Sequence, residues 1–447
     1  MHPLPQKEFS RKVIALAYPV VLGMIARTVM NLVDAAMVGR LGAAQLAATG
    51  LGAHIVLVVT YSYGSIHVGV QALTARRFGQ GKFDLCGRLI NRTVIMILGL
   101  GIVGSVIGFF SGPFFLSLLA DDPVVYRLGS SYVSIRLLEV FAFGVIGIYR
   151  GFFDGIGKTK INMQSMVVMN AVNIVLNYVL IFGKFGFPRL EVTGAAIASM
   201  ISCYIGAGVM IFHSVLPRYR EKYKIYKNIL PDFDLLRRLF KLSLPVMFQE
   251  FFVFTGFLLF MKILSMIGTF ELAAGNVCIA IMSVSFMPGY GIGVAAATLV
   301  GQNLGARRSD MAEKFGWEAV KLGVMLMGTI GIAFITIPGS IMRIFTPDTH
   351  IIQEGIIALR ILGFVQFFDA FGMIFSNCLR SAGMTRYVMA VDVTINWGIF
   401  LPAAYLLGIT FGMGTAGAWI SLALYVVLFG TIMGATFVKG SWKSIAI

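Results

Sequence analysis

The sequence predicts an all-α integral membrane protein with twelve transmembrane helices. We expect two six-helix bundles around a central cleft, related by a pseudo-twofold axis along the membrane normal. Only 13% of the 447 residues are charged and 58% are hydrophobic, whereas a water-soluble protein carries about 25% charged residues. Twelve stretches are apolar and long enough to cross a bilayer, which takes about 18 to 20 residues. The two halves of the chain also repeat a common pattern.

The apolar stretches are expected to be helices, because in lipid each backbone polar group needs a partner and a helix supplies it within one segment. The sequence lacks the alternating strands of about 10 residues that build an outer-membrane barrel. The first stretch begins near Val13 and is too long for a signal peptide, so we assign it as a span. The expected spans are residues 13–38, 47–73, 93–119, 132–153, 161–183, 192–215, 243–266, 272–300, 317–338, 356–379, 387–408 and 414–438.

Lys and Arg are distributed unevenly over the connecting segments. With the N-terminus placed in the cytoplasm, the inner segments carry 26 of the 36 basic residues, the outer segments carry 5, and 5 lie within spans. Basic residues concentrate on the cytoplasmic side of membrane proteins. The count therefore predicts a multi-pass protein of the cell membrane with both termini cytoplasmic. It also explains the net charge of +16 without a nucleic-acid partner.

Residues of the first half recur in the second half at an offset near 226. The segment Ala17–Val20 matches Ser243–Val246, and Gly157–Thr159 matches Gly383–Thr385. Spans 1–6 therefore repeat as spans 7–12. Because six is an even number, both halves share one orientation and form a parallel repeat, an arrangement suited to alternating access.

The repeat also defines the expected domains. Residues 1–215 are predicted to form an N-lobe, residues 216–241 a basic cytoplasmic linker, and residues 242–447 a C-lobe. Because one chain supplies both halves, we expect the protein to act as a monomer in the lipid bilayer.

A carboxylate of the first span lies deep in apolar sequence. A charged side chain in the membrane costs roughly 2.5–3.5 kcal/mol on insertion scales, and therefore suggests a function. Asp34 is about 9 Å from the outer end of span 1, and Asn31 shares its helix face. In span 5, Asn170, Asn173 and Asn177 also share one face, where they can hydrogen-bond Asp34 or join neighbouring helices.

Two further carboxylates are expected near the midplane of the second half. Glu250 and Asp369 lie about 13 and 16 Å from the cytoplasmic ends of their spans. Such a pair can share a proton or act as a metal site that ligates Na⁺ with hard oxygen atoms. Gln366 lies one turn from Asp369 and is placed to assist. We interpret the pair as a cation-coupling site, with a structural role as the alternative.

The remaining charges in the spans have simpler explanations. Arg136 with Glu139, and Arg150 with Asp154, are spaced for pairs within one helix. Asp392 falls near the inner end of span 11, where we expect it to contact water.

Prolines interrupt three of the apolar spans. Pro288 removes a backbone hydrogen bond in the middle of span 8, and such prolines kink helices. Pro19 and Pro245 occupy equivalent positions in spans 1 and 7. We expect all three to be kink or gating positions.

The sequence contains no catalytic or cofactor motif. It has 5 histidines and neither HExxH nor GxSxG. Gly157–Thr159 looks like the end of a P-loop, but the required glycine is replaced by Phe152. We therefore expect neither enzyme activity nor a cofactor, and any pumping must draw on an ion gradient or a partner.

Several stretches together resemble the multidrug and toxic compound extrusion (MATE) transporters, in their NorM-like bacterial branch. They are Val33–Gly39, Pro245–Glu250, Met287–Gly305 and Gln366–Asp369, and the resemblance extends over essentially the whole chain. It implies a V-shaped cleft and the Na⁺- or H⁺-coupled efflux of small organic, often cationic, drugs.

The resemblance also implies residue roles. Asp34 would hold the N-lobe cation or proton, with Asn173 and Asn177 nearby, and Glu250 and Asp369 would hold the C-lobe cation. Family members that use Na⁺ often carry a tyrosine one turn before the span 10 aspartate, where this chain has Val365. The choice between Na⁺ and H⁺ therefore stays open.

Drug antiport has two alternatives. A lipid-linked oligosaccharide flippase of the same superfamily would need cationic side chains for anionic phosphates, and Arg27, Arg136 and Lys262 are the candidates within spans. A membrane-embedded enzyme would need clustered catalytic groups, and the sequence does not provide them.

Overall fold

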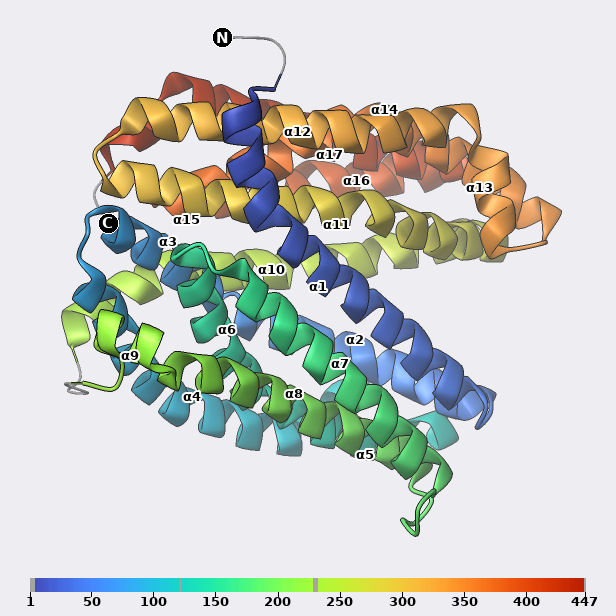
Figure 1. The fold of residues 1–447 in the computed structure, drawn as a ribbon. Helices are drawn as coiled ribbons and strands as arrows, with labels where there is room; N and C mark the ends of the chain where they lie inside the picture. Colours follow the sequence, from blue (N-terminus) through green and yellow to red (C-terminus); the bar gives the residue numbers. More distant parts are fainter. Residues whose placement is uncertain (1–4, 121, 228–231, 446–447) are drawn as a thin grey trace. The chain divides into compact units, whose positions relative to one another are not determined.

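The computed structural model describes residues 5–120, 122–227 and 232–445, and over these ranges the chain is helical (Figure 1). By length and composition, twelve helical segments of the described chain can cross a membrane, and each predicted span falls on one of them. The helices are α1 (Lys7–Gly39), α2 (Ala43–Gly64), α3 (Ile66–Gly79), α4 (Phe83–Ser117), α5 (Pro123–Leu137), α6 (Glu139–Gly155), α7 (Thr159–Phe182), α8 (Glu191–Val215), α9 (Pro217–Tyr223), α10 (Phe233–Ile267), α11 (Thr269–Gly305), α12 (Ser309–Thr336), α13 (Pro338–Phe345), α14 (Thr349–Ala382), α15 (Thr385–Ile395), α16 (Leu401–Tyr405) and α17 (Gly414–Lys439).

The chain divides into two compact units. Residues 22–250 form one, here called the N-unit, and residues 1–21 with 251–447 form the other, the C-unit. The unit boundaries fall inside α1 and α10, so the first helix of each half contributes to both units. The predicted lobes, which rest on the sequence repeat, stay a prediction.

The prolines expected to kink their helices lie inside them. Helices α1, α10 and α11 continue through Pro19, Pro245 and Pro288. Pro19 precedes the unit boundary in α1 by two residues, and Pro245 precedes that in α10 by five. A proline removes one backbone hydrogen bond and weakens a helix locally, so these positions are suited to bending.

Two spans of the N-unit are broken, which the sequence did not predict. Span 2 consists of α2 and α3 and is interrupted at Ser65, and span 4 consists of α5 and α6 and is interrupted at Leu138. The Leu138 carbonyl accepts hydrogen bonds from Ser105 Oγ at 3.2 Å and from the Tyr204 hydroxyl at 3.0 Å. A broken helix is tolerated in a membrane where side chains satisfy the exposed backbone in this way.

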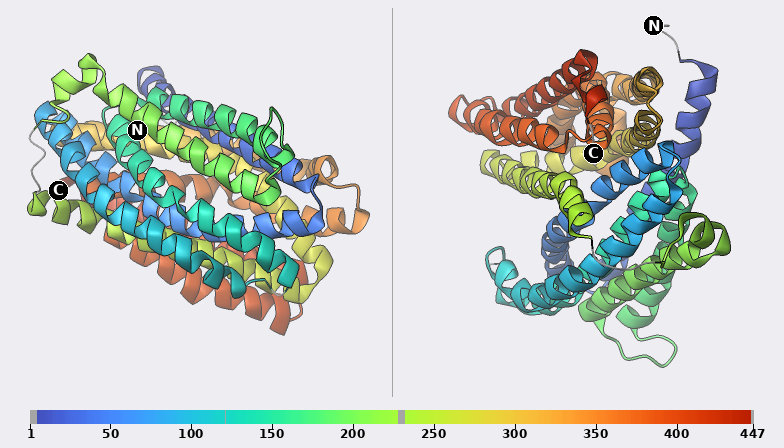
Figure 2. Two further views of the ribbon diagram at one scale, coloured as in Figure 1. Left: turned by 90° about the horizontal axis from the view of Figure 1, so that it is seen from below. Right: turned by 90° about the vertical axis from the view of Figure 1, so that its left-hand side faces the viewer.

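In the N-unit, α7 and α8 run side by side (Figures 1 and 2). The linker that follows α8 packs back onto this unit. Asn91 Nδ2 donates to the Lys224 carbonyl at 3.3 Å and to the Lys227 carbonyl at 2.7 Å, while the Tyr226 N–H donates to Asn91 Oδ1 at 2.6 Å. The described part of the linker is therefore bound to the N-unit.

In the C-unit, a buried carboxylate of α12 holds the start of α1. Glu318 is 3% exposed. Its Oε1 accepts the Gln6 N–H and the Ser10 hydroxyl, each at 2.5 Å. The first N–H groups of a helix have no partner within the helix and carry partial positive charge, so an anion there is stabilising.

Replacing Glu318 by leucine should destabilise the protein, because it removes the acceptor of the buried Ser10 hydroxyl and of the partly buried Gln6 N–H. The expected cost is about 2–3 kcal/mol, measured as a lower thermal unfolding midpoint of the purified protein. Glu313→Leu is the matched control on the same helix. Glu313 pairs with Lys443 at 2.5 Å in a partly exposed site, so its loss should cost less than about 1 kcal/mol. Equal shifts for the two variants would contradict this role.

Candidate functional site

A chain of hydrogen bonds leads to Asp34 in the N-unit. Asn177 Nδ2 donates to Asp34 Oδ1 at 2.5 Å and to Asn173 Oδ1 at 3.0 Å. Asn173 Nδ2 in turn donates to Ser199 Oγ on α8 at 3.2 Å. Asn173 and Asn177 are fully buried, while Asp34 is half-buried. The amides of α7 thus both bind the carboxylate and join α7 to α8, so both predicted kinds of contact are present.

The two other asparagines of this predicted group lie apart from the hydrogen-bond chain. Asn31 is exposed on α1 and has no hydrogen bond within the described residues. Asn170 is 5% exposed, and neither atom of its amide has a partner in the described chain. Asn170 therefore holds an unused donor and an unused acceptor in the interior of the unit.

Three arginines within the N-unit contact other side chains. Arg136 Nε lies 2.6 Å from Glu139 Oε1, as the spacing predicts, and its Nη1 donates to the Tyr132 hydroxyl at 3.3 Å. The Arg27 guanidinium lies over the rings of Tyr61 and Phe143, at 4.8 and 5.7 Å from their centroids. The second predicted pair is also present, with Arg150 Nε 3.5 Å from Asp154 Oδ2.

Of the predicted site carboxylates, Asp369 lies in the C-unit. It lies in the middle of α14, is half-buried, and has no hydrogen bond or ion pair with any described residue. Gln366, one turn earlier, is 1% exposed, and its Oε1 accepts the Ser285 hydroxyl of α11 at 2.6 Å. A carboxylate in a membrane span without a protein partner is available for a proton or a cation.

Glu250 is half-buried on α10 and is the last residue of the N-unit, whereas Asp369 belongs to the C-unit. Each unit is described separately, so the expected pairing of these two carboxylates stays a prediction.

The donor atoms of these sites restrict the ions that fit. Within the described ranges, no group of three or more His, Cys, Asp or Glu side chains can hold a metal ion. The four cysteines are buried and form no disulfide. Carboxylate, amide and hydroxyl oxygens are hard ligands. Single carboxylates among such neutral oxygens suit a proton or a monovalent cation better than a transition metal.

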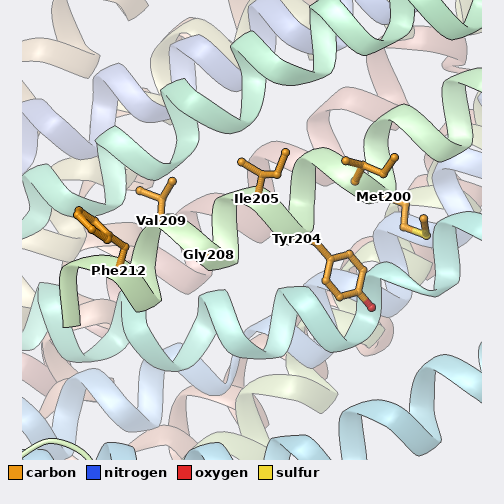
Figure 3. A pocket seen from close by; sticks show the side chains of 7 residues that line it. Met200, Tyr204, Ile205, Gly208, Val209 and Phe212 are labelled. Atoms are coloured by element: carbon orange, nitrogen blue, oxygen red, sulfur yellow. The ribbon is translucent and has the colours of Figure 1, made fainter. Parts of the chain in front are cut away.

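A groove of about 740 Å³ lies away from these polar sites, along one face of α8 (Figure 3). Its lining is apolar apart from Tyr204, whose hydroxyl binds the Leu138 carbonyl. None of the predicted site residues lines it. The lining residues are Met200, Ile201, Tyr204, Ile205, Gly208, Val209 and Phe212.

The position of Asp392 differs from the expectation from the sequence. Asp392 was expected to contact water, but it is 5% exposed, and the Tyr425 hydroxyl of α17 donates to its Oδ1 at 2.7 Å. The position of Asp392 near the end of its span does not show that α17 covers this face of α15. Glu318, Ser199 and Ser285 were also missed, because single hydroxyl or carboxylate residues give no spacing signal.

Comparisons with known proteins agree with the fold. A model of the family described as MatE matches residues 19–179 and, again, residues 245–406. The two matches start 226 residues apart, which confirms the internal repeat.

Among curated proteins, the chain is similar to two proteins called "Probable multidrug resistance protein NorM". It is 26% identical to that of Thermotoga maritima, over 98% of this chain and 94% of the relative, and 27% identical to that of Mannheimia succiniciproducens, over 95% and 92%. It is 25% identical to "Multidrug resistance protein MdtK" of Yersinia pestis, over 95% and 94%.

Among solved structures, the chain matches a MOP superfamily transporter from Pyrococcus furiosus with a TM-score of 0.89 at 20% identity, over 98% of this chain and 97% of that one. It matches "Outward-facing conformation of a multidrug resistance MATE family transporter of the MOP superfamily" equally well. At this identity the likeness shows the fold alone, and it confirms the predicted fold class.

The buried Arg136–Glu139 pair makes a testable contribution to stability. Arg136→Met leaves Glu139 as an uncompensated buried charge and should cost about 3–5 kcal/mol, whereas Arg136→Met with Glu139→Gln should cost clearly less. Thermal unfolding of purified variants measures both. The exposed pair Arg189–Glu191, at 3.2 Å, is the control, and Arg189→Met should change stability by less than about 1 kcal/mol. A double variant as unstable as the single one would contradict the pairing.

Proposed function

This chain belongs to the MatE family of membrane transporters, and from that premise we propose that it is a secondary active multidrug efflux transporter. In this proposal it exchanges Na⁺ or H⁺ for small organic, often cationic, drugs by alternating access. The main support for this proposal is that two half-buried carboxylates lie within membrane spans. Asp34 has an amide partner, and Asp369 has no partner among the described residues. The names of the curated relatives, which are multidrug resistance proteins, support the substrate class.

The proposed mechanism is competition between the coupling cation and the drug. A cation that binds Asp34, Glu250 or Asp369 favours one access state, and a cationic drug that depends on the same negative charge favours the other. Each ligand therefore lowers the affinity for the other by the same factor. Entry of the cation down its gradient then drives release of the drug.

The prolines provide a structural basis for the change between states. The unit boundaries lie two residues after Pro19 and five after Pro245. We assign both positions a gating role, in which the first helix of each half bends between its two parts, and we assign Pro288 a similar role in α11.

The flippase alternative is less well supported by the side chains. It requires several free cations for a phosphate group. Of the three candidates, Arg136 is bound by Glu139 and Tyr132 and Arg27 lies over two aromatic rings, which leaves Lys262. The relatives are transporters, which also argues against a membrane-embedded enzyme.

Drug efflux from proteoliposomes with either a Na⁺ or a pH gradient tests the proposed coupling. Asp34→Asn, Glu250→Gln and Asp369→Asn should each abolish or strongly slow gradient-driven efflux, because each removes a charge that binds the coupling cation. Glu313→Gln, which alters the partly exposed pair with Lys443, is the control and should transport like the unaltered protein. Transport by all three variants at the control rate would refute the assignment of the coupling sites.

The orientation proposed for the cell membrane, with both termini cytoplasmic, predicts where an introduced cysteine can be labelled. The native cysteines of the chain are buried and should react slowly. Lys184→Cys in an exposed outer loop should react with a membrane-impermeant maleimide on intact cells, and Arg308→Cys in an exposed inner loop should react only after lysis. The opposite pattern would invert the topology.

A further inference from the structure

Four arginines gather at one end of the N-unit, where three helices meet. This arginine cluster consists of Arg77 near the end of α3, Arg88 and Arg92 on α4, and Arg238 on α10. The positive charges of Arg88, Arg92 and Arg238 all act on the Arg77 guanidinium. Arg77 is partly buried, and the other three side chains therefore surround it within electrostatic reach.

Close packing of the helices fixes this arrangement. A Cβ atom at Gly69 of α3 would lie 3.1 Å from Leu239 Cδ1, so α3 lies against the turn of α10 that carries Arg238. Arg77 Nη1 donates to the Leu85 carbonyl of α4 at 2.7 Å, which joins α3 to the start of α4. The fold thus holds the arginines together at one place.

Acidic side chains neutralise one member of the cluster. Arg92 forms an ion pair with Asp232. Arg77, Arg88 and Arg238 form no ion pair with any described residue. Three positive charges therefore remain beside one another without an acidic partner in the described chain.

The two other carboxylates at the starts of these helices do not change this result. Asp84 and Asp234 lie in the first turns of α4 and α10, and neither forms an ion pair with a described residue. An acidic side chain in the first turn offsets the partial positive charge of the helix N-terminus. The two helix starts thus leave the charge of the arginines uncompensated.

The orientation of the chain in the membrane does not account for this convergence. Basic residues concentrate on the cytoplasmic side of membrane proteins, and scattered exposed residues satisfy that rule. Three guanidinium groups around a partly buried fourth repel one another instead. An anion bound among them would remove the repulsion, which indicates a binding site.

The side chains and their position select the anion. A guanidinium group presents a planar fork that binds two oxygen atoms of a phosphate. Helix α3 ends a membrane span at Gly79, and the next span begins at Phe83, so the cluster lies at the level of the lipid headgroups. Basic pockets between membrane helices on the cytoplasmic side bind anionic lipid headgroups.

An exposed aromatic ring beside the cluster favours a lipid over a soluble anion. Phe233 is the first residue of α10 and is 79% exposed. It lies five residues before Arg238 in the chain. Exposed apolar surface next to a basic site suits a ligand that has both a charged headgroup and acyl chains.

From this arrangement we propose that the arginine cluster binds the phosphate headgroup of an anionic phospholipid in the cytoplasmic leaflet. Arg77 lies at the centre of the site, Arg88 and Arg238 contribute from its exposed rim, and Asp232 holds Arg92. None of the residues proposed for ion coupling belongs to the cluster. The proposal therefore does not depend on the proposed transport function.

Native mass spectrometry of the purified full-length protein tests the site, with dioleoyl phosphatidylglycerol compared against dioleoyl phosphatidylcholine. A basic side chain near a membrane surface contributes about 1 kcal/mol, which is about fivefold in affinity. Phosphatidylglycerol should therefore bind about a hundredfold more tightly, and the triple variant Arg77→Gln, Arg88→Gln and Arg238→Gln should abolish that preference. Equal binding of the two lipids, or a triple variant that keeps the preference, would overturn the proposal.

The matched control removes the same number of charges from the C-unit. Arg307→Gln, Arg308→Gln and Lys314→Gln alter three exposed basic residues between α11 and the start of α12, on the same predicted side of the membrane. This triple variant should keep the preference for phosphatidylglycerol. If both triple variants lose it equally, the effect comes from net charge alone and the proposal fails.

Milder variants keep the test decisive if the triple variant of the cluster fails to fold. Arg77→Lys keeps the charge but loses the planar fork, and Arg238→Gln changes an exposed side chain. Each should weaken binding of phosphatidylglycerol about fivefold. Unchanged affinity in both variants would contradict the site.

Inorganic phosphate distinguishes a lipid headgroup from a soluble anion. It carries the group that the arginines recognise but has no acyl chains. Added in excess over phosphatidylglycerol, it should leave the bound lipid in place. Displacement of the lipid by inorganic phosphate would show that the site takes a soluble anion, and would overturn the assignment to a phospholipid.

Discussion

The constraint on which this structure depends is the cost of an unpaired polar group in the membrane interior. No water is available there, so backbone and side-chain groups must find partners within the protein. Where span 4 breaks at Leu138, Ser105 and Tyr204 supply the hydrogen bonds to its carbonyl. The same requirement makes exceptions informative, and among the described residues these include Asp369, Asn170 and Asn396.

Close helix packing follows from a related constraint, since helices in lipid associate through small residues. Gly331 of α12 and Gly363 of α14 face each other. A Cβ at either position would lie 2.6 or 2.5 Å from the carbonyl oxygen of the other. At such sites, unlike in turns, glycine allows two backbones to approach each other closely. This packing brings α12 close to α14, the helix that carries Asp369.

The sequence predicted the number and order of the spans because apolar length is a direct physical requirement of the bilayer. It also predicted the Arg136–Glu139 pair and the shared face of Asn173 and Asn177, since helix periodicity fixes which residues share a face. The contact of Asn177 with Asp34 was one of two alternatives from the spacing, and the family resemblance implied it. It did not predict the break at Leu138 or the burial of Asp392, because both depend on side chains of other helices. Tyr204 and Tyr425 are distant in sequence and carry no signal of what they contact.

The two halves share a backbone pattern but not a polar pattern. At the repeat offset of 226, Asp34 corresponds to Phe260, and Asp369 corresponds to Phe143. Asn170 and Asn396 are retained at equivalent positions, and both amides are buried without partners. Only Asn396 has a carboxylate one turn before it, since Met166 stands where the second half has Asp392. The two halves therefore share their helices but carry their charged residues at different positions. Cation binding in one half can thus differ in affinity from that in the other.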